Sequence, residues 1–501
     1  MGKTATFVQL AGIAPDETMT TPLYRQIYDG LRQAILSGQL VAGTRLPATR
    51  ALAAELHVAR NTVLIAFAQL FAEGYVEGYV GSGTYVAHTL PDDLLLARRK
   101  PARSAVASSP TGSDRALSQR GKLLAETRVM PPRFFRTPRA FHPGLPALDA
   151  FPYDLWARLA TRRWRSHDSS LMSYGDAVGY RPLREAIAAY VGAARAVRCT
   201  PEQVIIVAGS QQGLNLAACL LLDPGDAVWM EDPGYRGAYG ALAGAGARLV
   251  PVPIDAEGLD VTAGAARCAD VRMIYVSPSR QFPLGVTMSL ARRLALLEWA
   301  EQHNAWVLED DYDSEYRYAG RPLASLQGLD RRQHVIYIGT FSKVLFPGLR
   351  LGYLVVPPDL VDAFTAARAL ADRHSPLPDQ ATLADFIAEG HFTRHIRRMR
   401  MLYAERQAVL VEEAQRELCG LLDLPPAEAG MHLVGTLPDG VSDIAAAQRA
   451  AAFGVEVPAL SGYAVEARSH TGLMLGYACV DEAQIREGVR QLARALRTLM
   501  R

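Results

Sequence analysis

Apolar and polar positions in the first part of the chain alternate with the period of short helices. One such face carries Ile27, Leu31 and Ile35, with a threonine as the cap at its start and a glycine at its end. Residues 46–74 predict two further helices across a tight turn. Residues 75–87 then give two β-rich runs about a Gly-rich tip. Together these elements predict a winged helix-turn-helix.

Short apolar runs rich in Val and Ile alternate with helical segments in the last part of the chain. The runs are QVIIVAGS, DAVWMEDPG, ARLVPVPID, VRMIYVSPS, AWVLEDDYD and HVIYIGTFSK. Such alternation predicts an α/β domain with a mostly parallel sheet. Ligands collect at the carboxyl ends of strands in these sheets, and Ser210, Asp310 and Lys343 stand at such ends.

The stretch between these two patterns is rich in Arg, Lys, Ser, Ala and Pro and has no apolar period that could build a core. It predicts a flexible basic linker, with a contribution to binding DNA phosphates as the alternative. We therefore divide the chain into residues 1–87, a winged helix-turn-helix domain, 88–138, the linker, and 139–501, an α/β domain.

Composition limits the class of protein. With 49% hydrophobic and 21% charged residues, the 501-residue chain can form more than one core. The net charge of +2 means that any nucleic-acid surface must be local. Five scattered cysteines without a CxxC pair argue against a disulfide framework or a zinc ribbon. No apolar run reaches the roughly 18 residues of a membrane span, so we expect a cytoplasmic protein with no membrane partner.

A lysine in a Ser-Lys step after an apolar run suggests covalent chemistry. The amine of Lys343 could form a Schiff base with an aldehyde cofactor, namely pyridoxal phosphate. Such a cofactor needs a carboxylate for its ring nitrogen, and Asp310 directly follows a predicted strand. Tyr312 could reach the ring hydroxyl oxygen, and Tyr235 in EDPGY is a candidate for stacking on the ring.

A dianionic phosphate needs several donors, and the sequence supplies them near the same strand ends. Ser210 and Gln211 begin a predicted helix, whose free backbone N–H groups and dipole favour an anion. Thr340, Ser342 and Arg350 add hydroxyl groups and a fixed positive charge around the lysine.

Each of these signals has an ordinary explanation when it is taken alone. Ser-Gln at a strand end is often only a helix cap, EDDYD fits a solvated acidic loop or a metal cluster, and PGY is often a turn. HFTRH lacks the glutamate of a zinc protease helix, and GAGARL lacks the third glycine of a dinucleotide fingerprint, so we expect no metal or dinucleotide site. The order and spacing of the signals favour the pyridoxal phosphate hypothesis.

Two blocks of the chain carry specific resemblances. From about residue 140 the sequence resembles fold-type I aminotransferases through SYGDAVGYRPLREAIAAY, VAGSQQGLNLA, EDPGY, SRQFPLGVTMS, LEDDYDSEYRY and TFSKVLFPGLRLGY. The first ninety residues resemble the winged helix of GntR regulators through PLYRQIYDGLRQAILSGQLVAGTRLPATRALAAELHVARNTVLIAFAQLFAEGYVEGYVGSGTYVA. Their order, with a basic linker between them, is similar to that of the MocR family of bacterial transcriptional regulators.

The resemblance implies roles for individual residues. Lys343 matches the lysine that binds the cofactor, Asp310 the partner of the ring nitrogen, and Tyr312 the partner of the phenolic oxygen. The phosphate positions match Ser210, Gln211, Ser342 and Arg350, with Tyr174 reaching the phosphate of the partner subunit in a head-to-tail, swapped homodimer. The positions that contact double-stranded operator DNA match Arg45, Arg50, Arg60, Asn61, Thr62, Gly81, Gly83 and Thr84.

The chain departs from the aminotransferase pattern where the substrate carboxylate should bind. Met474 stands where the family places the carboxylate-binding arginine, and Arg468 is a weak substitute for it. Gly237 stands where some MocR members that bind amino-acid effectors have a second carboxylate-binding arginine, although the neighbouring Arg236 leaves this open. Arg280 stands where many relatives have histidine, and Phe282 where aminotransferases have asparagine. These differences argue against turnover of an ordinary amino acid.

Two hypotheses from different classes follow. In the first, the protein is a transcriptional regulator whose aminotransferase-like domain senses pyridoxal phosphate or a small amine or amino acid that reacts with it. In the second, it is a working aminotransferase that carries a DNA-binding module. Met474 favours the first hypothesis, and within it the PdxR-like branch, in which pyridoxal phosphate itself is the effector and the regulated genes serve its synthesis.

Overall fold

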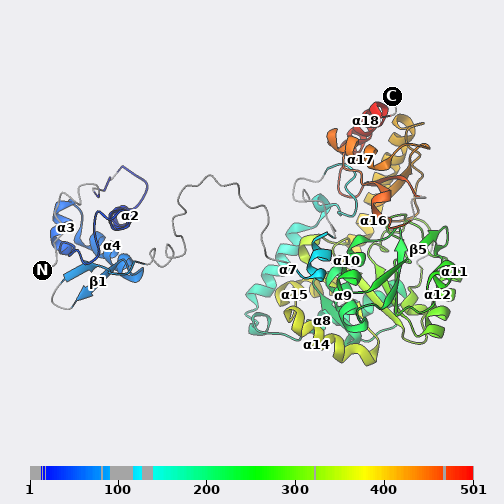
Figure 1. Cartoon of the computed structure of the whole chain (residues 1–501), viewed down its shortest axis with the longest axis horizontal. Helices are drawn as coiled ribbons and strands as arrows, with labels where there is room; N and C mark the ends of the chain where they lie inside the picture. The colour runs from blue at the N-terminus through cyan, green and yellow to red at the C-terminus, as the bar shows by residue number, and fades with distance from the viewer. Residues whose placement is uncertain are drawn as a thin grey trace. The chain divides into compact units, whose positions relative to one another are not determined.

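The computed structural model of the chain describes residues 13, 15–16, 18–79, 83–90, 117–126, 139–320, 323–466 and 470–499. The chain forms two compact units, Met1–Arg115 and Ala116–Arg501, and we describe each by itself (Figure 1). Among the described residues, no helix combines the length and the apolar character needed to cross a membrane.

The amino-terminal unit contains helices and a two-stranded hairpin in the order of a winged helix-turn-helix. Their bounds are α2 Leu23–Leu36, α3 Thr49–Glu55, α4 Arg60–Ala72, β1 Val76–Tyr79 and β2 Gly83–Val86. The hairpin strands pair antiparallel, from Val76 opposite Val86 to Tyr79 opposite Gly83. The prediction of this motif is confirmed.

One apolar core holds these helices together. The buried side chains include Ile27, Leu31, Leu52, Val63 and Phe67, from all of α2, α3 and α4. The predicted threonine cap is wrong, because α2 begins directly after Pro22, which has no side chain that could accept a hydrogen bond.

An eight-stranded sheet forms the centre of the larger unit. Its strands are β3 Val204–Val207, β4 Ala227–Asp232, β5 Arg248–Asp255, β6 Gly258–Leu259, β7 Met273–Val276, β8 Trp306–Asp311, β9 Val335–Thr340 and β10 Gly352–Val355. They lie in the order β3-β10-β9-β8-β7-β4-β5-β6. The pairs from β9 to β5 are parallel, whereas β10 is antiparallel to both of its neighbours and β6 is antiparallel to β5. The predicted mostly parallel sheet is confirmed.

Helices cover both faces of this sheet (Figure 1). Consecutive residues of β7 belong to different apolar cores, with Met273 and Tyr275 in one and Ile274 and Val276 in the other. The helices are α7 Tyr153–Arg165, α8 Arg181–Arg195, α9 Ser210–Leu221, α10 Arg236–Gly244, α11 Val261–Arg267, α12 Leu290–His303, α13 Leu326–Leu329, α14 Val361–Asp372, α15 Leu377–Ala388, α16 His391–Glu417, α17 Asp443–Ala452 and α18 Glu482–Leu499. Burial on both faces explains why these strands are continuous apolar runs in the sequence.

A smaller antiparallel pair completes the carboxyl-terminal part of the unit. Strands β11 His432–Thr436 and β12 Gly472–Gly476 pair with each other, while α17 and α16 both contact α18. The structure also places a helix, α6 Gln119–Glu126, inside the segment predicted as a linker without regular structure.

Candidate functional site

The carboxyl ends of β3, β8 and β9 bring the predicted cofactor residues to one edge of the sheet. Gly209 and Ser210 follow β3, Asp310 is the last residue but one of β8, and Lys343 follows β9. Parallel strands end at the same edge, so segments that are more than a hundred residues apart in the sequence meet there.

Lys343 lies in a partly buried position with its ammonium group held by the backbone. Its Nζ atom donates a hydrogen bond of 2.8 Å to the carbonyl oxygen of Gly144. Burial lowers the pKa of Lys343, while the charges of Asp313 and Asp310 oppose that shift. A lower pKa leaves a larger fraction of the amine neutral at physiological pH, which is the form that attacks an aldehyde.

Asp310 is buried beside the lysine and keeps one oxygen available. The hydroxyl of Tyr275, from the neighbouring strand β7, donates to Oδ2 of Asp310 at 2.8 Å. Oδ1 of Asp310 is buried without a hydrogen-bond partner among the described residues. Burial raises the pKa of Asp310 to about 6, against the hydrogen bond from Tyr275. A protonated ring nitrogen would satisfy this oxygen and neutralise the buried charge.

Tyr312 provides a second buried polar atom without a partner among the described residues, its hydroxyl oxygen. Burial raises the pKa of Tyr312 well above its ordinary value, so the phenol stays protonated and can donate. The phenolic oxygen of pyridoxal phosphate is an acceptor of the matching kind. The residues around Lys343 therefore fit pyridoxal phosphate at two independent positions, its ring nitrogen and its ring hydroxyl.

The first turn of α9 offers an anion site beside an arginine. Gly209 is the N-cap of α9 with φ of 98°, and it provides no side-chain cap for the first N–H groups. The guanidinium of Arg350 lies over Gly209, because a Cβ there would stand 3.5 Å from Nη1, and Nη2 donates to the carbonyl oxygen of Ala208 at 2.6 Å. Thr340 accepts a hydrogen bond from the backbone of Ser342 at 3.2 Å.

Gln211 and Tyr235 connect this turn with the next helix. The side-chain amide of Gln211 donates to the carbonyl oxygen of Gly237 at 2.9 Å. Tyr235 is the N-cap residue of α10, and its ring meets the ring of Phe282 edge to face at 5.9 Å. Tyr235 and Phe282 thus belong to one aromatic wall, which continues to Tyr312.

Phe282 stands at the centre of an aromatic cluster in this wall. Its ring centroid lies 6.0 Å from Tyr312, 5.8 Å from His432 and 5.2 Å from Tyr463. Such rings create an apolar boundary where an aminotransferase presents an amide to the cofactor.

The arginines near this wall already have partners. Arg280 donates to the carbonyl oxygens of Ala429 and His432 and lies 3.5 Å from a carboxylate oxygen of Asp313. Arg236 donates to the carbonyl oxygen of Gly462 at 2.7 Å.

Met474 occupies the position at which the family has its carboxylate-binding arginine, and it supplies no positive charge there. Met474 is fully buried in β12, and its thioether has neither a charge nor a hydrogen-bond donor with which to bind a carboxylate. The substitute considered for this role, Arg468, lies outside the described residues.

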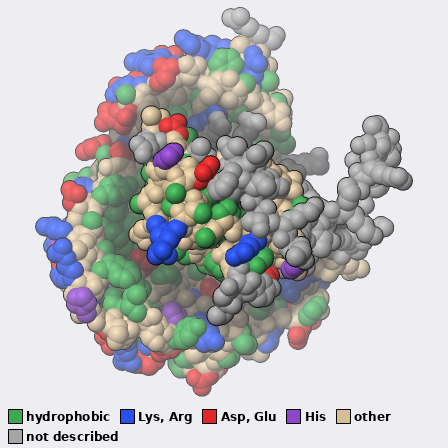
Figure 2. Space-filling view, turned by 90° about the vertical axis from the view of Figure 1, so that its left-hand side faces the viewer, with side chains coloured by type: hydrophobic (Ala, Val, Ile, Leu, Met, Phe, Trp, Pro, Cys, Tyr) green, Lys and Arg blue, Asp and Glu red, His purple; other side chains and the backbone are tan. Residues whose placement is uncertain are grey.

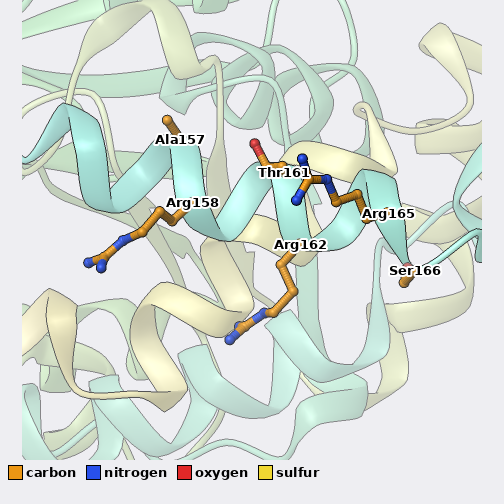
Figure 3. Close-up of a pocket in the computed structure, with 6 residues that line it drawn as sticks. All are labelled: Ala157, Arg158, Thr161, Arg162, Arg165 and Ser166. Carbon is orange, nitrogen blue, oxygen red and sulfur yellow. The ribbon is translucent and has the colours of Figure 1, made fainter.

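The structure does not bring Tyr174 to the lysine of its own chain. Its side chain is 78% exposed, and the guanidinium of Arg373 lies 4.7 Å from its ring centroid. A hollow of about 620 Å³ lies along helix α7 (Figure 3), and it is lined by Ala157, Arg158, Thr161, Arg162, Arg165 and Ser166. None of these six residues belongs to the lysine site.

In the DNA-binding unit, the predicted contact residues lie at the start of α4 and around the hairpin. Arg60 is the first residue of α4 and is exposed, and its N-cap Ala59 has no side-chain cap, so the first N–H groups can face a phosphate. The next two residues, Asn61 and Thr62, belong to the same turn. Basic and acidic side chains are interspersed on the face shown in Figure 2.

The wing carries the other predicted contacts. The guanidinium of Arg45 lies against Gly83, because a Cβ there would stand 2.9 Å from Nε. Thr84 is half-buried in β2, and Arg50 is exposed in α3. Gly81 lies outside the described residues.

Several residues of the site are absent from the sequence prediction. Gly144 and Tyr275 hold Lys343 and Asp310, and Asp313 pairs with Arg280. A tyrosine on a strand next to that of Asp310 is a signal that could have revealed Tyr275. The role of Gly144 depends on a fold contact across 199 residues and has no local signal.

Comparisons with known proteins agree with both halves of this description. The family of bacterial regulatory proteins named gntR matches residues 23–86, and the family aminotransferase class I and II matches residues 150–492. The solved structure of the α-aminoadipate aminotransferase LysN from Thermus thermophilus, complexed with N-(5'-phosphopyridoxyl)-L-leucine, matches with a TM-score of 0.67 and 33% identity. The match covers 72% of this chain and 92% of that chain.

Relatives with both domains match over nearly the whole chain. The probable rhizopine catabolism regulatory protein MocR of Rhizobium meliloti is 44% identical over 487 residues, which cover 97% of this chain and 96% of that protein. The pyridoxine biosynthesis transcriptional regulator PdxR of Corynebacterium glutamicum is 30% identical over 482 residues, which cover 96% and 97%.

The fold and the site thus define a DNA-binding regulator built on a pyridoxal phosphate domain. The chain belongs to the MocR family of GntR-type transcriptional regulators, and its α/β domain is a fold-type I aminotransferase-like domain that binds pyridoxal phosphate.

Proposed function

We propose that pyridoxal phosphate bound at Lys343 is the sensor through which this regulator changes its affinity for operator DNA in the cytoplasm. The observation that carries the proposal is that two buried polar atoms, Oδ1 of Asp310 and the hydroxyl of Tyr312, have no hydrogen-bond partner within the described part of the chain. Occupation of the site can change DNA binding only if the cofactor binds one arrangement of the protein better than another.

The proposal assigns each side chain a role toward the cofactor. Lys343 holds the aldehyde carbon, Asp310 pairs with the ring nitrogen, and Tyr312 donates to the ring oxygen. Tyr235 packs on the ring. The phosphate is held by Ser210, Gln211, Thr340, Ser342 and Arg350. When bound, the cofactor supplies an electrophilic carbon that reacts with primary amines.

The surroundings of the site support a sensor. Arg280 is engaged with two carbonyl oxygens and lies beside Asp313, and the thioether of Met474 carries no charge, so neither residue can bind a substrate carboxylate in the way that an arginine does. A carboxylate that is not gripped is poorly oriented for repeated proton transfer.

The second ligand is a small amine or amino acid that reacts with the bound cofactor. The relatives favour such a ligand over pyridoxal phosphate alone as the signal. The chain is 44% identical to MocR, which is named for rhizopine catabolism, and 30% identical to PdxR, which is named for pyridoxine biosynthesis. In the alternative, pyridoxal phosphate itself is the signal and the protein controls the genes of vitamin B6 synthesis.

The competing proposal is a working aminotransferase, favoured by the intact group of Lys343, Asp310 and Tyr312. A panel of amino acids with a keto-acid acceptor separates the two. We expect no steady production of the keto product from the amino donor, because the carboxylate is not gripped, although the absorption spectrum of the bound cofactor can shift. Sustained turnover on any member of the panel would establish the enzyme instead.

We further propose that the cofactor site is completed by a second copy of the chain. Tyr174 is 78% exposed, and Trp164 and Met172, on or near α7, are 58% and 68% exposed. Trp164 and Met172 line a second hollow of about 320 Å³, and large exposed side chains at a hollow favour an interface. In such a homodimer, Tyr174 would reach the phosphate bound by the partner.

Mixed dimers test this shared site. A dimer of one Lys343→Ala chain and one Tyr174→Phe chain contains one fully native site if Tyr174 acts across the interface, since the first chain lends its tyrosine to the lysine of the second. We expect about half of the wild-type high-affinity cofactor binding, measured by titration, whereas either variant alone lacks it. If mixing restores no high-affinity site, Tyr174 does not act across an interface.

A further inference from the structure

Helix α6 lies at the beginning of the second unit, a few residues after the boundary at residues 115 and 116, and packs on the cofactor domain. It contacts α10, where the side chain of Leu124 rests on Gly244 at the end of that helix. A Cβ at Gly244 would stand only 2.8 Å from Cδ2 of Leu124. The absence of a side chain at this position therefore allows the close approach.

The other end of α10 belongs to the cofactor site. Tyr235 is its N-cap residue, and the tyrosine ring lies over Gly237, where a Cβ would stand 2.4 Å from Cζ. Gln211, in the phosphate turn, donates to the carbonyl oxygen of Gly237. Helix α10, which has nine residues and is about 13 Å long, thus connects Tyr235 at the cofactor site with Gly244, the position that contacts α6.

Helix α6 is too short to be stable by itself. It has eight residues, and isolated helices below about 12 residues are marginal in water. Its contact is also modest, because Leu124 remains 46% exposed and Leu123 37% exposed. The stability of a helix that depends on a small contact changes when the surface beneath it, here the end of α10, shifts slightly.

We propose that the end of α10 is a docking surface for α6, and that occupation of the cofactor site strengthens this docking. The inference rests on the proposed function. The cofactor packs against Tyr235, the N-cap residue of α10, and binds the turn of Gln211, whose side chain donates to Gly237 in the same helix. Both interactions hold α10 in place and therefore also fix Gly244 at its other end. Docked α6 fixes the chain near residue 118, which is 20 residues nearer in sequence to the DNA-binding unit than residue 138, the end of the predicted linker. The anchor changes which arrangements of the DNA-binding units are accessible.

Limited trypsin digestion of the full-length protein reads this docking directly, because Arg120 and Lys122 lie on α6. We expect pyridoxal phosphate to slow cleavage at both residues about threefold to tenfold. Leu124→Asp, which removes the contact but leaves α10 unchanged, should abolish this protection while the visible absorption of bound cofactor persists. Leu117→Asp, the same change at a 58% exposed leucine just before α6, is the control and should behave like the wild type.

The outcomes separate the two proposals. Cofactor absorption without any protection of Arg120 and Lys122 in the wild type would overturn the docking role of α6 and leave the sensor proposal intact. Full protection in the Leu124→Asp variant would overturn it as well. Absence of cofactor absorption in the wild type would instead contradict the proposed function itself.

Discussion

Replacement of Lys343 by alanine is expected to abolish the visible absorption of bound pyridoxal phosphate and to weaken cofactor binding by about two orders of magnitude, or about 3 kcal/mol. The lysine supplies the bond to the aldehyde carbon, and its lowered pKa favours the neutral amine that forms it. The contacts of Asp310 and Tyr312 remain in the variant, so some noncovalent binding should persist.

The Lys343→Arg variant is the control for charge. Arginine keeps a positive charge in the pocket but cannot form the bond, so it should lose the absorption as alanine does. A visible band that survives in both variants would show that another lysine binds the cofactor. Thermal unfolding of both proteins verifies that the fold is retained.

Replacement of Arg60 by alanine is expected to weaken operator binding about tenfold to a hundredfold, corresponding to about 1–3 kcal/mol for one base contact. Arg60 is exposed at the first position of α4, where a recognition helix meets base edges in the major groove. Binding to unrelated DNA should change much less, because the contact reads sequence. Affinities are compared by fluorescence anisotropy at one fixed salt concentration.

The matched control for Arg60 is Arg25→Ala, which removes an arginine from α2 in the same unit. Arg25 is paired with Asp29 at 3.3 Å and lies away from α4's first turn in sequence, so its loss should leave operator binding nearly unchanged. A uniform loss of affinity on all DNA sequences in Arg60→Ala would instead make Arg60 a phosphate contact.

The sequence predicts the central strands well, because strands buried on both faces are continuous apolar runs. It gives no orientation for β10, which lies only nine residues after Lys343 and returns antiparallel beside β9. The connection between the two strands includes Arg350, whose φ of 50° lies in the left-handed region that few non-glycine residues adopt. Local pattern does not reveal such a conformation.

Some residues of the candidate site can likewise be predicted from the sequence, and others cannot. Residues that stand at strand ends, such as Asp310 and Lys343, can be proposed from their position in the sequence. Their supports, Tyr275 and Gly144, become visible only when strands and loops are packed. Helix α6 is likewise unpredicted, because eight residues with two adjacent leucines show no helical apolar repeat and the helix depends on its contact with α10.

The most direct test of the account is the operator affinity of cofactor-free and cofactor-loaded protein, measured in parallel for the wild type and Lys343→Ala. We predict that pyridoxal phosphate changes the affinity of the wild type at least about fivefold, a coupling of about 1 kcal/mol, and leaves the variant unchanged. Equal affinity of the two wild-type forms, in protein whose absorption shows a full site, would contradict the claim that this cofactor is the sensor.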